Sequence, residues 1–341
     1  MKKSNLTTLC YLEKDDCYLM MHRVRKQQDV NAGKWIGVGG HFEPGESPED
    51  CLLREVKEET GLTLTSYRFR GLVTFTQEGF GTEYMCLYTA DGFTGELTGC
   101  EEGDLEWVRK DRIKDLRLWD GDVLFLSYMA MEKPFFSLKL EYQGDLLVKA
   151  ELDGKPLELF EVLNEDGTSS GHIKERSLVH RDGDWHGTVH TWIARRRPDG
   201  GWQLLFQKRS SEKESFPGKL DISSAGHRQA GEEALPTAVR ELKEELGLCV
   251  SEEELEFLQM RKGIVRENFG GEPYYDREIA SLYLYEKPVD AKSLRFEDGE
   301  VQDVRWIDLE VCSRQIKEGD ASYCVRPDEI EILENALARL S

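Results

Sequence analysis

A short pattern of residues occurs twice in this chain, at an offset of 186 positions, and it constrains the fold more than any other feature. Only the stretch around these positions repeats, while the rest of the two halves has diverged. Two isolated copies predict two compact domains rather than a solenoid of stacked repeats. The recurring positions are Gly40, Glu46, Arg54, Glu55, Glu58, Glu59, Gly61 and Leu62 in the first copy, and Gly226, Glu232, Arg240, Glu241, Glu244, Glu245, Gly247 and Leu248 in the second.

Each copy stands in the same local setting of a strand-like run, a glycine turn and a helix. Pro48 suits the first turn of its helix, and Gly61 and Gly247 suit left-handed caps at the ends of the two helices. Strands and helices are mixed in both halves, which predicts an α/β fold made of two α/β/α sandwiches with mixed sheets. The expected strands include residues 35–38, 105–108, 220–222 and 304–307, with a long β-rich stretch over residues 72–88, and the expected helices open at residues 47–49 and near Glu233.

The boundary between the halves is predicted from turn residues. Residues 135–140 and 146–150 alternate between apolar and polar side chains, like the two strands of a closing hairpin. Residues 153–156, with the sequence Asp-Gly-Lys-Pro, form a turn-rich break. We therefore expect one domain over residues 1–152 and the other over residues 157–341.

The glutamates of each copy are spaced to share one face of a helix. A helix advances about 100 degrees per residue, so Glu58 and Glu59 lie about 60 degrees to one side and about 40 degrees to the other side of Glu55. Carboxylates crowded in this way repel one another unless a cation joins them. An oxygen-rich site of this kind suits Mg²⁺ or Mn²⁺, which also bind substrate phosphates. The arginine beside each cluster, Arg54 or Arg240, can orient a carboxylate through a bidentate pair.

Both copies fit the pattern Gly-x5-Glu-x7-Arg-Glu-U-x-Glu-Glu-x-Gly-U, in which U is aliphatic, and the chain here resembles the Nudix hydrolase superfamily. The resemblance implies a metal-dependent attack of water on a phosphoanhydride bond, with one glutamate of each cluster acting as base or metal ligand. The catalytic candidates are Arg54, Glu58, Arg240 and Glu244, and the metal-ligating candidates are Gly40, Glu55, Glu58, Glu59, Gly226, Glu241, Glu244 and Glu245.

The first half resembles the 8-oxo-dGTP diphosphatases, through residues 8–9, 32–35, 39–40 and 118–122 in addition to the repeated pattern. The resemblance implies that Trp119 and Asp122 close over a purine, and that Glu102 helps to bind the metal. Two positions depart from the family: Ile36 stands where an asparagine reads the base, and Gly121 stands where a second aspartate is common. The candidate residues for substrate binding in this half are Thr8, Trp119 and Asp122.

The second half resembles the Nudix proteins related to isopentenyl-diphosphate isomerase, through residues 161–167, 188–190, 207–209, 216–219 and 225–227. The true isomerases hold an extra metal with three histidines and two glutamates. They also carry a catalytic cysteine where this chain has Ala225, and alanine cannot protonate an alkene carbon. We therefore expect a hydrolase. The resemblance implies a possible second metal at His180, His190, His227, Asp276 and Glu278, and the candidate phosphate contacts are Lys208, Arg209 and Lys219.

Two alternatives stay open. The second half could be an isomerase, against which Ala225 argues, or a Nudix fold could serve as a non-catalytic ligand-sensing module. Sensors tend to lose the glutamates, which both copies keep. The expected activity is therefore hydrolysis of nucleoside polyphosphates in the first half, including oxidised purine triphosphates with release of pyrophosphate, and a second diphosphatase behind it.

Charge and composition limit the classes of molecule that this protein is expected to bind. The formal net charge is −21, from 45 basic and 66 acidic residues, and such an acidic surface repels nucleic-acid backbones and anionic lipids. No stretch approaches the roughly 20 apolar residues of a membrane span, and the N-terminus makes a poor signal peptide. The eight cysteines form no CxxC pair. We expect a cytoplasmic protein that binds a small nucleotide or another diphosphate, and neither nucleic acid nor membrane; no oligomeric state is predicted.

Overall fold

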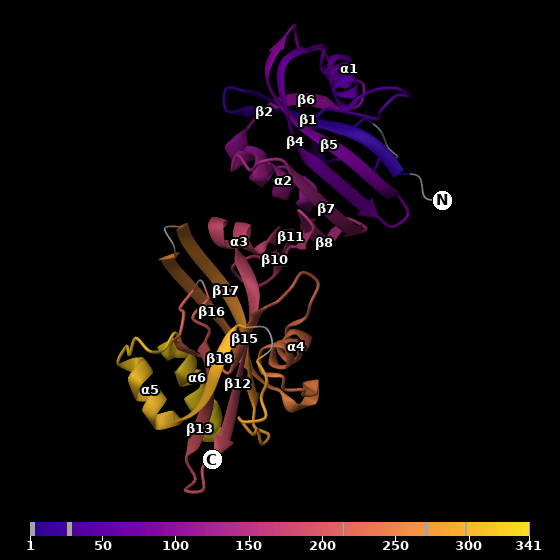
Figure 1. The fold of residues 1–341 in the computed structure, drawn as a ribbon. Coiled ribbons are helices and arrows are strands. Elements are labelled where there is room, and N and C mark those ends of the chain that lie inside the picture. The colour runs from indigo at the N-terminus through magenta and orange to yellow at the C-terminus, as the bar shows by residue number, and fades with distance from the viewer. Residues whose placement is uncertain (1–3, 26–28, 214, 270–271, 297–298, 341) are drawn as a thin grey trace. The chain divides into compact units, whose positions relative to one another are not determined.

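The computed structural model describes residues 4–25, 29–213, 215–269, 272–296 and 299–340. These residues form two compact units, one made of Met1–Leu159 with Ile173–Glu175, the other of Phe160–His172 with Arg176–Ser341. Both units combine a large mixed sheet with helices (Figure 1).

The first unit contains nine strands and two α-helices among its described residues. Its strands are β1 (Ser4–Lys14), β2 (Cys17–His22), β3 (Trp35–Ile36), β4 (Thr63–Gln77), β5 (Gly81–Thr94), β6 (Asp104–Arg109), β7 (Phe136–Gln143), β8 (Leu146–Leu152) and β9 (Lys155–Pro156). Its helices are α1 (Pro48–Thr60), α2 (Asp120–Ala130) and the short 3₁₀ turn η1 (Lys110–Asp115).

The sheet of the first unit runs in the order β3-β2-β1-β5-β4-β7-β8-β9, with β6 paired to β2. It is mixed, because β1 pairs with β5 and β4 with β7 in parallel, whereas most other pairs are antiparallel. Leu52 of α1 packs with Cys10 of β1, while Phe125 of α2 packs with Tyr11. Successive side chains of a strand point to opposite faces, so the two helices cover opposite faces of the sheet.

The second unit contains a further nine strands and four α-helices among its described residues. Its strands are β10 (Leu159–Leu163), β11 (Ser169–Glu175), β12 (Trp185–Arg196), β13 (Trp202–Arg209), β14 (Leu220–Asp221), β15 (Ser224–His227), β16 (Glu256–Phe269), β17 (Glu272–Tyr285) and β18 (Val301–Asp308). Its helices are α3 (Arg176–Asp182), α4 (Ala234–Leu246), α5 (Leu309–Lys317) and α6 (Pro327–Arg339), with a short 3₁₀ turn η2 (Glu252–Glu254).

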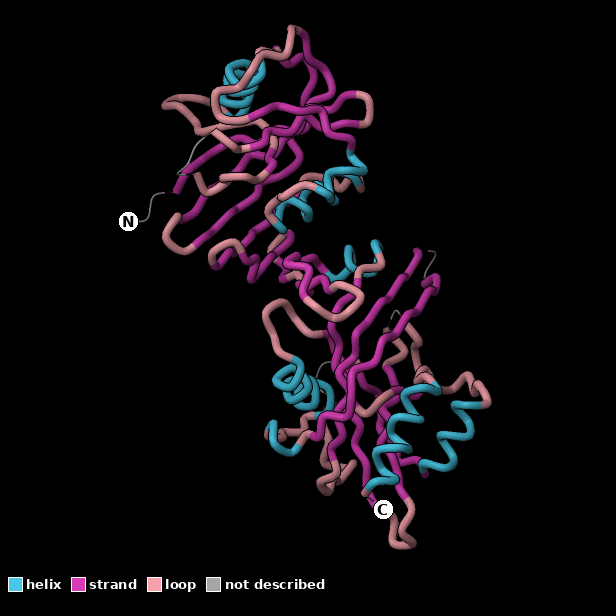
Figure 2. Tube along the Cα trace, turned by 180° about the vertical axis from the view of Figure 1, so that it is seen from behind, coloured by secondary structure: helices cyan, strands magenta, loops and turns pink. Residues whose placement is uncertain are grey.

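Strand β12 is the centre of the second sheet. It pairs with β10, β13, β15 and β17, and its pairing with β17 is parallel. Val189 and Ile193 of this strand pack with α4, whereas Trp192 and Ala194 pack with α5 and α6. The second unit is therefore also a sheet covered by helices on both faces, and Figure 2 shows these helices in cyan around the strands.

The local predictions are confirmed where the structure tests them. Helix α1 has Ser47 as its N-cap and Pro48 in its first turn, and it ends at Gly61 with φ +75°. Helix α4 begins after Glu233 and ends at Gly247 with φ +64°. Only glycine adopts these left-handed angles without steric cost. The expected hairpin corresponds to β7 and β8, and the strands expected at residues 105–108 and 304–307 correspond to β6 and β18.

Within the part of the chain that the structure describes, no helix has both the length and the apolar character that a bilayer crossing requires.

We expect fragments cut between residues 152 and 157 to fold alone, because each would carry its own sheet and helices. Circular dichroism and thermal unfolding of fragments 1–152 and 157–341 should each show a cooperative transition. Insolubility of both fragments alongside a soluble full-length chain would argue against this boundary.

Candidate functional sites

Arg54 connects the glutamates of the first copy. Its guanidinium forms a bidentate pair with Glu46, with N–O distances of 2.7 and 2.9 Å. The same side chain reaches Glu55 at 2.7 Å and Glu58 at 3.2 Å. Arg54 therefore sets the orientation of the carboxylates on α1, as the sequence suggested, although its bidentate partner is Glu46.

The glycine turn lies directly against the remaining carboxylates. The amide of Gly39 donates to Glu59 at 2.7 Å, and a Cβ on Gly40 would lie 2.4 Å from the carboxylate carbon of Glu55. No other residue fits there without displacing the carboxylate. Burial raises the pKa of Glu59 to about 8, and repulsion from the nearby carboxylates of Glu102 and Glu55 acts in the same direction.

The second copy repeats this geometry. Arg240 pairs with Glu232 at 2.9 and 3.2 Å, with Glu241 at 2.7 Å and with Glu244 at 2.8 Å. The amide of Ala225 donates to Glu245 at 3.0 Å. Burial raises the pKa of Glu241 to about 7 and that of Glu245 to about 8.

A Cβ on Gly226 would lie 2.0 Å from the carboxylate carbon of Glu241. Both copies thus place carboxylates of one helix against a glycine turn, and in both the most buried carboxylate, Glu59 or Glu245, accepts a hydrogen bond from a backbone amide. Carboxylate and backbone oxygens in this arrangement suit a hard divalent cation such as Mg²⁺.

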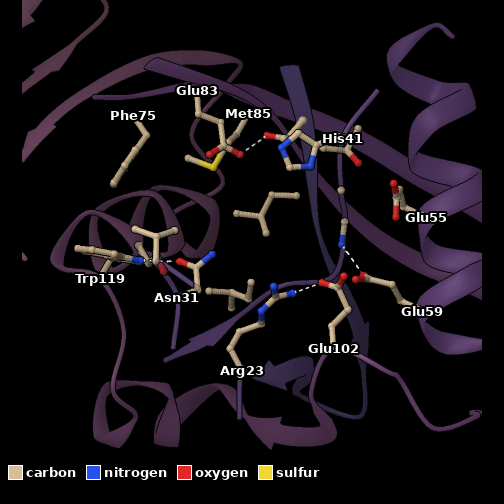
Figure 3. A pocket seen from close by; sticks show the side chains of 18 of the residues that line it. Arg23, Asn31, His41, Glu55, Glu59, Phe75, Glu83, Met85, Glu102 and Trp119 are labelled. Carbon is tan, nitrogen blue, oxygen red and sulfur yellow. Dashed lines mark hydrogen bonds and ion pairs between the residues drawn. The ribbon is translucent and has the colours of Figure 1, made fainter. Parts of the chain in front are cut away.

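A cavity of about 320 Å³ opens beside the glutamates of the first unit. In the view of Figure 3, Glu55, Glu59 and Glu102 lie along one side and Trp119 lies on the other. Glu102 also contacts Arg23, which is held by Asp29 at 2.7 Å. The cavity therefore has an acidic end that can hold a metal and an aromatic end. It is lined by Thr7, Thr8, Leu9, Arg23, Val30, Asn31, Ile36, Gly39, Gly40, His41, Glu55, Glu59, Phe75, Glu83, Met85, Glu102, Trp119, Asp122 and Leu140.

The aromatic end combines Trp119 with a buried carboxyl group and an amide. Trp119 donates its ring N–H to the side-chain oxygen of Asn31 at 2.8 Å, and the Lys34 ammonium lies 3.8 Å from its ring centre. Asp122 Oδ2 is buried without a hydrogen-bond partner among the described residues. Burial raises the pKa of Asp122 to about 8, so this carboxyl group is largely protonated near pH 7 and can donate a hydrogen bond.

Sequence reasoning missed Asn31, Arg23 and Glu83 as residues of this cavity. The sequence did offer a signal for Asn31, because it is an amide in the glycine-containing loop directly before β3. Arg23 and Glu83 come from strand ends that only the folded sheet brings to the cavity. The structure also gives a reason for Gly121, since a Cβ there would lie 2.4 Å from Cδ1 of Leu140. An aspartate at this position would require the Leu140 side chain to shift.

The three cations proposed as phosphate contacts in the second half have different surroundings. Arg209 is paired with Asp221 at 2.7 Å and donates to the carbonyl of Ser215 at 3.1 Å, so it stabilises the local loop. Lys219 lies 5.3 Å from the ring centre of Phe216. Because Arg209 is already engaged by Asp221 and Ser215, Lys208 and Lys219 are the better candidates for contact with a phosphate.

Three histidines of the second unit come together from separate elements. They are His180 of α3, His186 of β12 and His227 of β15, and one ring nitrogen of each lies within 4.8 Å of the others. Phe160 stacks on His186 and His227 with ring centres 5.4 and 4.6 Å away. Burial lowers the pKa of all three rings, that of His180 to about 3, so their lone pairs are available. Neutral imidazoles in this arrangement suit a transition metal.

The structure places His186, and not the predicted His190, beside His180 and His227. His186 and His190 lie on the same face of β12, four residues apart. His190 is instead held by Glu329 of α6, 3.0 Å from Nδ1, and its Nε2 lies 3.7 Å from Glu278. Burial opposes the charged ring, but Glu329 and Glu278 outweigh it and raise the pKa of His190 well above its usual value.

Asp276 and Glu278, predicted from the same resemblance, both face this region from β17. Asp276 Oδ1 lies 3.4 Å from Nε2 of His186 and 3.9 Å from Nε2 of His180. Burial raises the pKa of Asp276. For Glu278 burial acts in the same direction, but His190 and Arg261 outweigh it and lower its pKa. The two carboxylates therefore occupy different electrostatic environments.

Comparison with known proteins identifies the class to which both halves belong. The NUDIX domain matches residues 3–127 and 186–324, and the chain therefore belongs to the Nudix family of hydrolases.

The relatives cover parts of the chain. Nudix hydrolase 3 of Arabidopsis thaliana is 35% identical over 170 residues, which are 49% of this chain and 21% of that protein. The chain thus spans about a fifth of the length of this relative. The oxidized purine nucleoside triphosphate hydrolase of Danio rerio is 34% identical over 131 residues, 38% of this chain and 83% of that protein.

A crystal structure of the mutator MutT protein from Bacillus halodurans is 26% identical with a TM-score of 0.40, and it covers 45% of this chain and 99% of that one. Independently of this structure, the Danio rerio relative shows that the first half resembles oxidized purine nucleoside triphosphate hydrolases. The resemblance of the second half to isomerase-like proteins gains no support from these relatives and stays a prediction.

Proposed function

We propose that the first half hydrolyses purine nucleoside triphosphates, oxidised purines included, and releases pyrophosphate. The observation that carries this proposal is the cavity, which joins a carboxylate cluster to an aromatic end with a protonated carboxyl group. A nucleotide has the same two parts, an anionic chain that needs a metal and a flat base with hydrogen-bonding edges. The name of the Danio rerio relative supports the same substrate class.

The residues at the acidic end have separable tasks. Arg54 fixes Glu55 and Glu58, and the amide of Gly39 fixes Glu59, so the carboxylates are preorganised before substrate arrives. When bound, Mg²⁺ or Mn²⁺ neutralises the phosphates and acidifies an attacking water. One glutamate of the cluster accepts the proton of that water. Arg23 lines the cavity beside Glu102 and can contact a phosphate.

The second half is a Nudix diphosphatase in this proposal. Its carboxylates and Arg240 repeat the geometry of the first half, and Lys208 and Lys219 can contact a phosphate. It also holds a transition metal at His180, His186 and His227. The fit rests on three buried atoms without a hydrogen-bond partner among the described residues, namely Nε2 of His180, Nε2 of His186 and Oδ1 of Asp276. One cation would satisfy all three.

A substrate screen tests the proposal. Full-length protein carrying Glu244→Gln, which silences the second half, is incubated with Mg²⁺ and with purine or pyrimidine triphosphates, their 8-oxo forms, and sugar, thiamine and isoprenoid diphosphates. Pyrophosphate release should be fastest with purine triphosphates. Equal rates for purines and pyrimidines, or turnover only of non-nucleotide diphosphates, would contradict the assignment of the first half.

The preference among purines should depend on pH through Asp122. Its carboxyl group donates a hydrogen bond below a pKa of about 8 and loses the proton above it, so the preference should decline as the pH rises through 8. Loss of one such hydrogen bond is worth about 1–3 kcal/mol, which corresponds to roughly 5- to 150-fold in kcat/KM. The measurement is kcat/KM for each purine between pH 6 and 9.

Asp122→Asn provides the matched control, because its amide keeps the shape and does not titrate. The variant should show a flatter preference that no longer changes with pH. A uniform loss of rate for every nucleotide would mean that Asp122 only supports the fold.

A further inference from the structure

Asp276 and Glu278 of β17 lie beside buried histidines of the second unit, and their partners differ. Asp276 Oδ1 has no hydrogen-bond partner among the described residues and faces the ring nitrogens of His180 and His186. Glu278 is held on both oxygens. Its Oε1 lies 3.5 Å from Nη1 of Arg261, and its Oε2 accepts from the hydroxyl of Thr188 at 3.4 Å.

The two cations beside Glu278 are His190, whose Nε2 lies 3.7 Å from Oε2, and Arg261. Both contact acidic residues of the C-terminal helix α6. Glu329, which is 1% exposed, accepts from Nδ1 of His190 at 3.0 Å and from the indole of Trp192 at 2.9 Å. Asp328 pairs with Nε of Arg261 at 2.8 Å. We call His190, Arg261, Asp328 and Glu329 the α6 clamp.

We propose that the α6 clamp keeps Glu278 out of the ligand set, so that the metal of this half is held by His180, His186, His227 and Asp276 alone. This inference rests on the proposed metal site and deepens it. It makes His190 and Glu329 positioning residues, which act on the site through Glu278. Three imidazoles and one carboxylate form a four-ligand set that suits Zn²⁺ or Co²⁺, whereas a fifth ligand would raise the coordination number.

Charge balance gives the physical reason. His190 and Arg261 are almost fully buried, and Glu278 supplies part of the negative charge that they face. If Glu278 moved onto a metal, it would leave these buried cations with one counter-charge fewer. Separating a buried ion pair is strongly unfavourable, because water does not replace the lost partner. Among the described residues Asp276 forms no ion pair with His190 or Arg261, and its Oδ1 gains a partner by binding the metal.

The ligand set is tested by metal binding to the full-length chain. Zn²⁺ and Co²⁺ affinities are measured with Mg²⁺ in excess, so that Mg²⁺ fills the two glutamate sites. We expect His186→Ala and Asp276→Asn to weaken binding more than about a hundredfold, and Glu278→Gln to weaken it by no more than about ten- to a hundredfold, the range of a nearby group that is not a ligand. Equal losses for Asp276→Asn and Glu278→Gln would overturn the assignment.

The visible spectrum of bound Co²⁺ tests the role of the clamp and does not depend on whether Glu278→Gln folds. Four-coordinate Co²⁺ absorbs intensely and five- or six-coordinate Co²⁺ weakly. The native chain should give the intense spectrum, and Glu329→Gln, which releases His190, should weaken it. A merely structural Glu329 would lower the melting temperature and leave the spectrum unchanged, which would refute the clamp.

A native chain with a weak spectrum would refute the four-ligand set. A native chain that binds neither metal, or binds it equally well after His186→Ala, would refute the proposed metal site itself, and the two failures are therefore distinguishable.

Discussion

Glu58→Gln and Glu59→Gln should each lower nucleotide turnover by the first half about a hundredfold or more. Both side chains belong to the carboxylate cluster on α1, and each substitution removes a metal ligand or the base while keeping the size of the side chain. Steady-state rates of pyrophosphate release with a purine triphosphate and Mg²⁺ give the measurement. Glu244→Gln, the equivalent change to Glu58→Gln in the other copy, is the matched control and should leave this turnover nearly unchanged.

Stability measurements separate a catalytic effect from unfolding. Glu59 has a folded pKa of about 8, above its ordinary value of about 4.5. A raised acid pKa means that the folded state binds the proton more tightly, so the ionised carboxylate destabilises the fold fully above pH 8 and this cost disappears below pH 4.5. Metal-free Glu59→Gln should therefore melt no lower than the native chain at neutral pH. Normal metal binding and turnover in both variants would show that the site is assigned wrongly.

The second half should hydrolyse a diphosphate and leave the carbon skeleton of isopentenyl diphosphate unchanged. Alkene protonation needs an acid placed at carbon, and Ala225 supplies none, since its backbone amide serves only to hold Glu245. Glu278 is kept ionised by His190 and Arg261, so it is a poor source of a proton. Glu244 and the other carboxylates on α4 supply what water attack on phosphorus requires.

Full-length protein carrying Glu58→Gln, which silences the first half, is incubated with isopentenyl diphosphate and Mg²⁺ in D₂O. Nuclear magnetic resonance should show no deuterium at carbon and no dimethylallyl product. The diphosphatase activity found in the substrate screen should fall about a hundredfold or more when Glu244→Gln is added. Deuterium at carbon would overturn the hydrolase assignment.

The sequence by itself determined the features that depend on local spacing. The three carboxylates of each copy share a helix face because the helical repeat is fixed, and Gly61 and Gly247 end these helices because they tolerate left-handed angles. The repeat of both features predicted two Nudix domains with mixed sheets, and the family match and the strand pairing confirm this. The close approach of Gly40 and Gly226 to a carboxylate follows from the same short segments.

Only the tertiary structure decided which side chains from distant segments meet. His186 and His190 point to the same face of β12 because they are four residues apart, so their spacing cannot show which of them joins the histidine cluster. The packing of α3 places His180 beside His186, and the packing of α6 gives His190 to Glu329. Asn31 enters the nucleotide cavity for a similar reason, because its loop is folded against Trp119. Contacts of this kind depend on how helices and loops pack on a sheet, and periodicity along one segment carries no information about that packing.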